Sequence, residues 1–106
     1  ENKDIYKNLK IKKIIDNKNL KDLFNDLFEN QIYDVLVEAG PKLTGYFIKN
    51  KLLNELWHYQ APIIIGDDGR GFALLSEIKN MKDVILFSKV IESKILGVDL
   101  LRVFAV

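Results

Sequence analysis

The 106-residue sequence contains no cysteine and a single histidine, His58. Disulfide frameworks, thiol nucleophiles and zinc sites built from several cysteine or histidine ligands are therefore excluded for this stretch of chain. We expect no metal site here. The lack of cysteine is compatible with a reducing compartment, and we expect a cytoplasmic protein.

A charge imbalance and a long hydrophobic run are also missing. In mixed order, 16 basic and 15 acidic residues give a formal net charge of +1. That balance offers no argument for a nucleic-acid or membrane-surface partner. Nothing longer than about a dozen residues is uniformly apolar, so we expect neither a transmembrane helix nor a signal peptide. With 48% hydrophobic residues, the composition fits one globular domain with an adequate core.

One stretch in the first half of the chain shows the clearest change of pattern. Tyr33–Val37 is short, rich in β-branched residues and nearly continuous in its hydrophobicity, which is typical of a strand buried on both faces of a parallel sheet. Gly40 is suited to a helix N-cap, and Pro41 to the first helical position. The sequence therefore predicts a strand, a tight turn containing Glu38, and a helix that runs to about Asn50.

Such a turn is a common place for a ligand. In open α/β sheets, ligands collect beyond the carboxyl ends of strands, near helix N-termini whose free N–H groups favour anions. Glu38 is either a carboxylate that caps the following helix or one that accepts hydrogen bonds from hydroxyl or amino groups of a polar ligand. The sequence alone leaves both interpretations open.

Gly45 is unusual because it lies inside the predicted helix, where glycine costs roughly 1 kcal/mol against alanine. One interpretation is that the backbone there lies close to a ligand or to a neighbouring strand. The other is a small residue tolerated in tight packing. The pattern favours neither.

The other elements follow from periodicity and turn signals. Apolar residues at helical spacing predict an amphipathic helix from Leu20 to Glu29, with Asn19 as its N-cap and Asn30 in the left-handed closing position. The order β-α-β-α-β, a loop and β-β predicts an α/β fold with a mixed sheet and flanking helices. The further elements that we expect are strands at Leu9–Ile15 and Leu53–Tyr59, a short helical turn within Phe72–Met81, and a closing antiparallel hairpin of residues 83–96 and 99–106.

Other polar residues have simpler interpretations. His58 falls in the middle of a predicted strand and fits a packed structural histidine better than a general base. The loop Gly66–Gly71 lacks the spacing of a phosphate-binding P-loop, and we interpret it, with its Asp67–Asp68 pair, as a solvated loop. No residue is a convincing general acid, so we assign no catalytic residue.

The exact amino-acid sequence of residues 35–71 is more informative than its pattern of polar and apolar residues. This segment reads VLVEAGPKLTGYFIKNKLLNELWHYQAPIIIGDDGRG. It resembles the C-terminal reductase domain of the bifunctional riboflavin-biosynthesis deaminase-reductase. The coupled residues that carry the resemblance are Glu38, Gly40-Pro41, Leu43, Glu55-Leu56, Ala61-Pro62 and Gly66.

The resemblance implies a dihydrofolate-reductase-like fold, of which residues 1–106 would form the C-terminal half. It implies NADPH-dependent reduction of 5-amino-6-(5-phosphoribosylamino)uracil, a pyrimidine ribonucleotide, with hydride transfer to C1′ of the ribose. The first half of the reductase domain and the zinc-dependent deaminase domain are not in this chain. The resemblance also implies a homodimer.

Carried over by position, Glu38 resembles the family's substrate-binding carboxylate. The residues that resemble the turn and first helical turn lining NADPH are Gly40, Pro41, Lys42, Leu43, Thr44, Gly45 and Tyr46. This agrees with the suitability of free N–H groups at a helix start for a cofactor's phosphates.

We expect that the 106-residue chain is not a competent enzyme by itself. Two alternatives stand beside the reductase hypothesis. One is an assembly module that pairs through an exposed sheet edge and apolar surface. The other is an unrelated nucleotide-binding α/β domain whose turn at Glu38 binds another phosphate ligand.

Overall fold

The computed structural model of the protein describes residues 20–106. The strand predicted at Leu9–Ile15 and the N-cap predicted at Asn19 lie outside these residues. The chain divides into two compact units, Glu1–Val37 and Glu38–Val106. Within the described residues, no helix is both long enough and apolar enough to span a bilayer.

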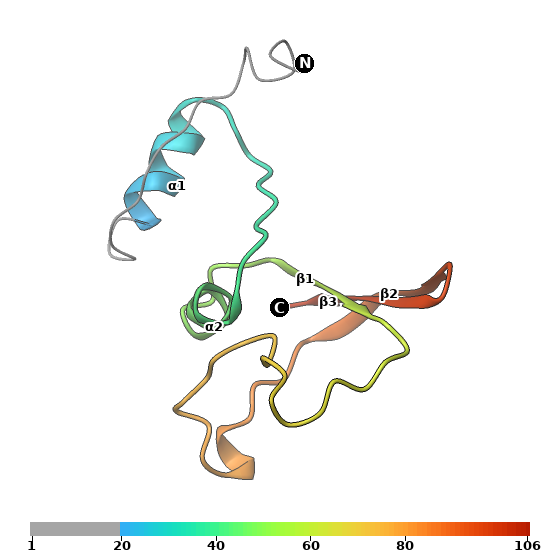
Figure 1. Ribbon diagram of the computed structural model, residues 1–106. Helices are drawn as coiled ribbons and strands as arrows, with labels where there is room; N and C mark the ends of the chain where they lie inside the picture. The colour runs from blue at the N-terminus through green and yellow to red at the C-terminus, as the bar shows by residue number, and fades with distance from the viewer. Residues whose placement is uncertain (1–19) are drawn as a thin grey trace, which may run out of the picture. The chain divides into compact units, whose positions relative to one another are not determined.

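The described part of the first unit is a helix followed by an irregular segment (Figure 1). Helix α1 spans Leu20–Glu29, as predicted, and carries Asp22 in its first turn, where a carboxylate meets the positive end of the helix dipole. The left-handed residue that closes it is Gln31, with φ of 61°, and not Asn30 as predicted. Asn30 instead donates both its backbone N–H, at 3.1 Å, and its side-chain amide, at 2.7 Å, to the Asp26 carbonyl at the helix end.

The prediction of a buried strand at Tyr33–Val37 is wrong. This segment has no regular secondary structure, and its side chains are exposed, with Leu36 at 81%. A central strand needs a neighbour on each side for its N–H and C=O groups, and no described residue pairs with this one. The parallel part of the predicted mixed sheet is therefore not formed among residues 20–106.

Helix α2 spans Pro41–Lys49 in the second unit, close to the predicted bounds. Gly40 is its N-cap and Pro41 occupies the first helical turn, both as predicted. Phe47 and Ile48 are buried on one side of the helix. The local signals for a helix start therefore decide where α2 begins.

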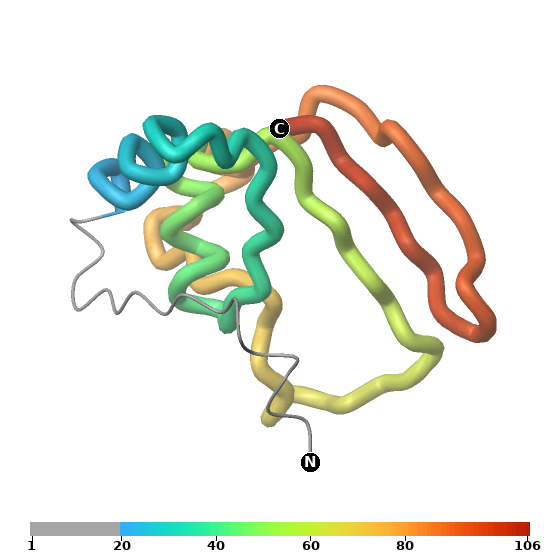
Figure 2. The backbone as a smooth tube through the Cα atoms, turned by 90° about the horizontal axis from the view of Figure 1, so that it is seen from above, coloured from blue at the N-terminus to red at the C-terminus, as the bar shows by residue number. Residues whose placement is uncertain are grey.

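Three strands of the second unit form one antiparallel sheet in the order β1-β3-β2 (Figure 2). Strand β1 spans Glu55–Gln60, β2 spans Lys89–Leu96 and β3 spans Asp99–Ala105. β2 and β3 make the predicted closing hairpin. Gly97 occupies the first turn position with φ of 65°, a left-handed value that glycine adopts without strain.

The best-buried residues of the sheet lie on its central strand, β3. Leu101 is 2% exposed and Val103 is 3% exposed. They stand directly opposite Tyr59 and Trp57 of β1, on the same face of the sheet. On the β2 side they are flanked by Glu92 and Lys94, which form an ion pair of 2.9 Å. Trp57 and Tyr59 themselves remain 51% and 56% exposed.

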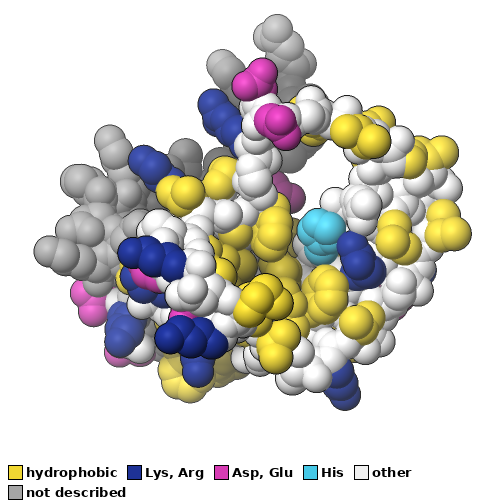
Figure 3. Space-filling view, turned by 90° about the horizontal axis from the view of Figure 1, so that it is seen from below, with side chains coloured by type: hydrophobic (Ala, Val, Ile, Leu, Met, Phe, Trp, Pro, Cys, Tyr) yellow, Lys and Arg dark blue, Asp and Glu magenta, His cyan; other side chains and the backbone are white. Residues whose placement is uncertain are grey.

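A long connection, residues 61–88, joins β1 to β2. Its described regular element is a 3₁₀ helix, η2, at Met81–Asp83, where Asn80 and Asp83 exchange capping hydrogen bonds. The helical turn predicted within Phe72–Met81 instead begins at Met81, the last residue of that range, because Asn80 is its N-cap. In the space-filling view from below, apolar side chains gather near the centre of the view (Figure 3).

We expect Leu101→Ala to lower the free energy of unfolding by roughly 2–5 kcal/mol, because it removes buried methyl groups and leaves a cavity. Ile64→Ala is the matched control, since Ile64 is 100% exposed and its truncation should change stability by less than about 0.5 kcal/mol. Chemical denaturation followed by Trp57 fluorescence measures both. Equal effects would contradict the assignment of the core to β3.

Candidate functional site

The turn that begins α2 is held by main-chain and hydroxyl contacts. Its N-cap, Gly40, is extended, with φ of −73° and ψ of 175°. The N–H of Thr44 donates to the Gly40 carbonyl at 3.0 Å, and the Thr44 hydroxyl donates to the Ala39 carbonyl at 3.3 Å. Thr44 therefore ties the helix back to the turn that precedes it.

A cavity of about 440 Å³ opens at this turn. The N–H groups of Lys42 and Leu43 find no backbone acceptor among residues 20–106, as is usual in the first turn of a helix. Free N–H donors beside cationic side chains suit the anionic part of a ligand. The cavity is lined by Gly40, Pro41, Lys42, Leu43 and Arg70.

Arg70 is the cavity residue that the sequence pattern did not predict. It follows a tight turn in which the N–H of Gly69 donates to the Gly66 carbonyl at 3.1 Å. Gly66 has φ of 88°, a left-handed value, and a Cβ on Gly69 would lie 3.1 Å from the Gly66 carbonyl oxygen. The signal that could have found this cation is its position directly after Gly66 and Gly69, the two glycines that the tight turn requires.

Glu38 lies in the turn but is not among the residues that line the cavity. Its side chain is exposed and makes no hydrogen bond or ion pair with any described residue. The capping interpretation of Glu38 is therefore wrong, because neither Glu38 nor any other described side chain makes a capping hydrogen bond to α2. Its role as a substrate-binding carboxylate stays a prediction.

Gly45 has a clear structural reason. A Cβ on this residue would lie 2.1 Å from the Leu74 carbonyl oxygen and 2.9 Å from its carbonyl carbon, which is far inside van der Waals contact. The Leu74 N–H also donates to the Pro41 carbonyl at 2.8 Å. The close neighbour is therefore the backbone of the 61–88 connection.

The structure separates the predicted cofactor residues into two groups. Gly40, Pro41, Lys42 and Leu43 line the cavity. Thr44, Gly45 and Tyr46 do not: the Thr44 hydroxyl is bonded to the turn, Gly45 faces Leu74, and the Tyr46 carbonyl accepts hydrogen bonds from the backbone and side chain of Asn50. Their contact with a cofactor stays a prediction.

The sequence of this chain matches a known protein family. The sequence profile described as "RibD C-terminal domain" matches residues 1–98 of the 106. The chain belongs to the RibD C-terminal domain family. The alternative of an unrelated nucleotide-binding domain is therefore wrong.

Two curated relatives show how this chain compares in length. It is 40% identical over 85 residues to "Riboflavin biosynthesis protein RibD" of Buchnera aphidicola subsp. Baizongia pistaciae, covering 80% of this chain and 22% of the relative. It is 29% identical over 69 residues to "5-amino-6-(5-phosphoribosylamino)uracil reductase" of Buchnera aphidicola subsp. Acyrthosiphon pisum, covering 65% of this chain and 33% of that protein. The chain thus spans a third or less of either relative's length.

A solved structure agrees. The fold of this chain matches that of Acinetobacter baumannii RibD with a TM-score of 0.75 and 30% identity, over 92% of this chain and 25% of that one. The α/β, dihydrofolate-reductase-like class predicted from the sequence is confirmed.

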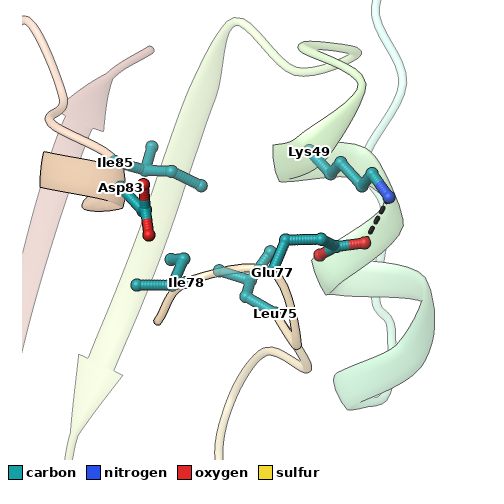
Figure 4. Close-up of a pocket in the computed structure, with 6 residues that line it drawn as sticks. All are labelled: Lys49, Leu75, Glu77, Ile78, Asp83 and Ile85. Carbon is teal, nitrogen blue, oxygen red and sulfur yellow. Dashed lines mark hydrogen bonds and ion pairs between the residues drawn. The ribbon is translucent and has the colours of Figure 1, made fainter. Parts of the chain in front are cut away.

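A second cavity, of about 370 Å³, lies between α2 and the connection (Figure 4). Its apolar wall is made by Leu75, Ile78 and Ile85. Its charged groups already have partners. Lys49 of α2 forms an ion pair with Glu77, and the Asp83 carboxylate accepts from the N–H groups of Lys79 and Asn80. This cavity therefore fastens the connection to the helix and offers no free charge to a ligand.

His58 is packed, as the sequence indicates. It is half-buried on β1, and its ring lies 5.7 Å from that of Phe72, tilted by 60°. In residues 20–106 no three His, Asp or Glu side chains are grouped closely enough to hold a metal ion.

Gly45→Ala tests the packing at the start of α2. Helix propensity alone would make it stabilising by roughly 1 kcal/mol, whereas the clash with the Leu74 carbonyl should make it destabilising by about 1–3 kcal/mol. Gly71→Ala is the control, because its Cβ would meet only Ala73 at an ordinary 3.8 Å. Urea denaturation gives the sign, and a stabilised Gly45→Ala protein would contradict the contact.

Lys49→Met tests the ion pair at the second cavity. The hydrogen bond from the Lys49 side chain is the largest of the effects that hold the pKa of Glu77 below its ordinary value. The stabilisation is therefore present above the ordinary carboxyl pKa and is lost as the pH falls through the lowered one. We expect Lys49→Met to raise the Glu77 pKa in a ¹³C NMR titration and Lys89→Met to leave it unchanged. A Glu77 pKa insensitive to Lys49→Met would show that the pair is not formed in solution.

Proposed function

We propose that this chain is the C-terminal part of an NADPH-dependent reductase in riboflavin biosynthesis. The reaction is reduction of the ribosyl group of 5-amino-6-(5-phosphoribosylamino)uracil to the ribityl form. Membership of the RibD C-terminal domain family and the printed names of the relatives support it. The structural observation that carries it is the cavity at the start of α2, where free N–H donors meet Lys42 and Arg70.

The residues at this cavity fit a dinucleotide cofactor. Its volume lies within the range of small-molecule sites, and Lys42 offers both a cation and a main-chain N–H donor. When bound, the nicotinamide supplies the hydride, so that the protein contributes binding, orientation and electrostatics. Gly40 leaves the approach open, because a Cβ there would meet nothing within 4 Å, and Pro41 sets the helix direction. Lys42 and Leu43 hold the phosphates.

Glu38 is the residue that we assign to the pyrimidine ribonucleotide. Its carboxylate is exposed and has no partner among the described residues, so it is available to accept hydrogen bonds from hydroxyl or amino groups. It stands two residues before the N-cap of α2, next to the cavity-lining turn. A carboxylate that receives charge-assisted hydrogen bonds orients a polar substrate strongly.

The surface of the second unit supports an incomplete domain. Ile63–Ile65 are consecutive and exposed, and Ile64 is exposed at 100%. Exposed apolar patches of this kind mark interaction surfaces. We propose that the preceding half of the reductase domain covers them, and that this chain is inactive alone. The zinc of the parent enzyme belongs to its deaminase domain, which would lie in that preceding part.

A second candidate function, assembly, is favoured by the free edge of the sheet. Among residues 20–106, strand β2 pairs with β3 on one side only, and all of its residues are exposed. An edge with unpaired N–H and C=O groups can add a strand from another chain. We propose a homodimer of the complete enzyme that uses this edge, as an addition to the reductase function.

NADPH oxidation in the presence of the pyrimidine substrate tests the proposed function. We expect turnover by the whole reductase domain that contains this chain, and none by residues 1–106 alone. Within the whole domain, Glu38→Gln should lower kcat/KM by about 10–100-fold, since it removes a charged acceptor, and should leave the affinity for NADPH unchanged. Glu29→Gln is the control, because Glu29 is an exposed residue of α1 that neither lines the cavity nor belongs to β2.

The possible results separate the claims. Full turnover by the isolated chain would refute the incomplete-domain proposal. Absence of turnover by the folded whole domain would refute the reductase proposal. A Glu38→Gln protein as active as Glu29→Gln would refute the role of Glu38.

A further inference from the structure

We infer that Arg70, acting with Lys42, binds a phosphate group of the nucleotide ligand in the cavity at the start of α2. This inference rests on the proposed function, because it names a residue that recognises the ligand of the same site. Arg70 lies in the loop Gly66–Gly71, outside the turn that the sequence connects with a cofactor. The cavity brings it together with that turn.

The position of Arg70 is fixed by contacts on both sides. Before it, the Gly69 N–H donates to the Gly66 carbonyl at 3.1 Å and closes a tight turn. After it, the backbone of Leu74 packs against Gly45 and donates its N–H to the Pro41 carbonyl at 2.8 Å. The short segment that carries Arg70 is thus attached to the first turn of α2 by the main chain itself.

The charges at this cavity are uncompensated. Arg70 and Lys42 are exposed and form no ion pair or hydrogen bond with any described residue. The carboxylates nearest in sequence, Glu38 and the Asp67–Asp68 pair, are not among the lining residues. Arg70 and Lys42 line the same cavity and have no counter-charge among the described residues, so an anion bound there is attracted by both.

The second cavity shows the contrast. There Lys49 is neutralised by Glu77, and the Asp83 carboxylate is held by two backbone N–H groups. The chain therefore has one described cavity with its charges paired and one with two free cations. Arginine is the cation best suited to phosphate, because its planar guanidinium can donate two parallel hydrogen bonds.

The half-buried Pro41 and Leu43 give the cavity an apolar wall beside these cations. An apolar wall excludes water from one side of a bound anion and so strengthens its attraction to the guanidinium. A nucleotide combines both features, with a phosphate for the cations and an apolar ring or sugar face for the wall. The phosphate could be supplied by the dinucleotide or by the pyrimidine nucleotide, and the two share the same recognition chemistry.

Dissociation constants measured by isothermal titration calorimetry on the whole reductase domain test this inference. The probes are NADPH, NADH, and the pyrimidine substrate with and without its 5′-phosphate. We expect Arg70→Met to weaken at least one phosphate-bearing probe by about tenfold or more, because it removes a charge-assisted contact. Arg70→Lys should restore part of the loss. Lys82→Met, a change of the same charge outside the cavity, is the control and should alter nothing.

The pattern of the losses identifies the phosphate. A loss for NADPH alone assigns the 2′-phosphate, an equal loss for NADPH and NADH assigns the pyrophosphate, and a loss confined to the phosphorylated pyrimidine assigns the 5′-phosphate. Unchanged constants in Arg70→Met, or an equal loss in Lys82→Met, would overturn the inference. If the unaltered domain binds none of the probes, the proposed function fails instead. Circular dichroism of each variant shows that the comparison is made between folded proteins.

Discussion

The second unit depends on the contact between the backbones of Gly45 and Leu74. A side chain at position 45 would occupy the place of the Leu74 carbonyl, at 2.1 Å, and the Leu74 N–H is at the same time bonded to the Pro41 carbonyl. Both interactions are made by the main chain. They therefore require that position 45 has no side chain, and they do not depend on complementary side chains. Because Arg70 lies just before Leu74, the contact that packs the connection against α2 also decides where the cation lies. Packing and binding chemistry are therefore linked through one glycine.

The elements that the sequence predicts correctly are those whose signals are local. Pro41 after Gly40 begins α2, and Gly97 turns the hairpin, because fixed or left-handed backbone angles act within a few residues. The strand expected at Tyr33–Val37 fails for the opposite reason. Its hydrophobicity indicates only that the segment favours a buried environment. The hydrogen bonds that form a strand must come from residues far away in the sequence. At the end of α1 the side chain of Asn30 bonds to a carbonyl, and the left-handed angle passes to Gln31.

The candidate site divides in the same way. The four residues from Gly40 to Leu43 could be predicted to share a surface, because they are consecutive at a helix start, and they do line one cavity. Gly45 could be recognised as unusual, yet only the folded chain shows that Leu74 is its neighbour. Arg70 reaches the cavity from another part of the chain, and no periodicity connects it with Lys42. Sequence patterns thus predict the half of the site that is contiguous and miss the half that tertiary contacts bring to it.

The three exposed isoleucines at positions 63–65 have a consequence for the solubility of the newly synthesised chain. Runs of β-branched residues at the surface favour pairing between copies and precipitation. Here the run is bounded by Pro62, which lacks the N–H that a growing ladder needs, and by Asp67 and Asp68, whose like charges repel an approaching copy. These flanking residues act as gatekeepers. We expect them to reduce aggregation of the newly synthesised chain as long as the three isoleucines are exposed.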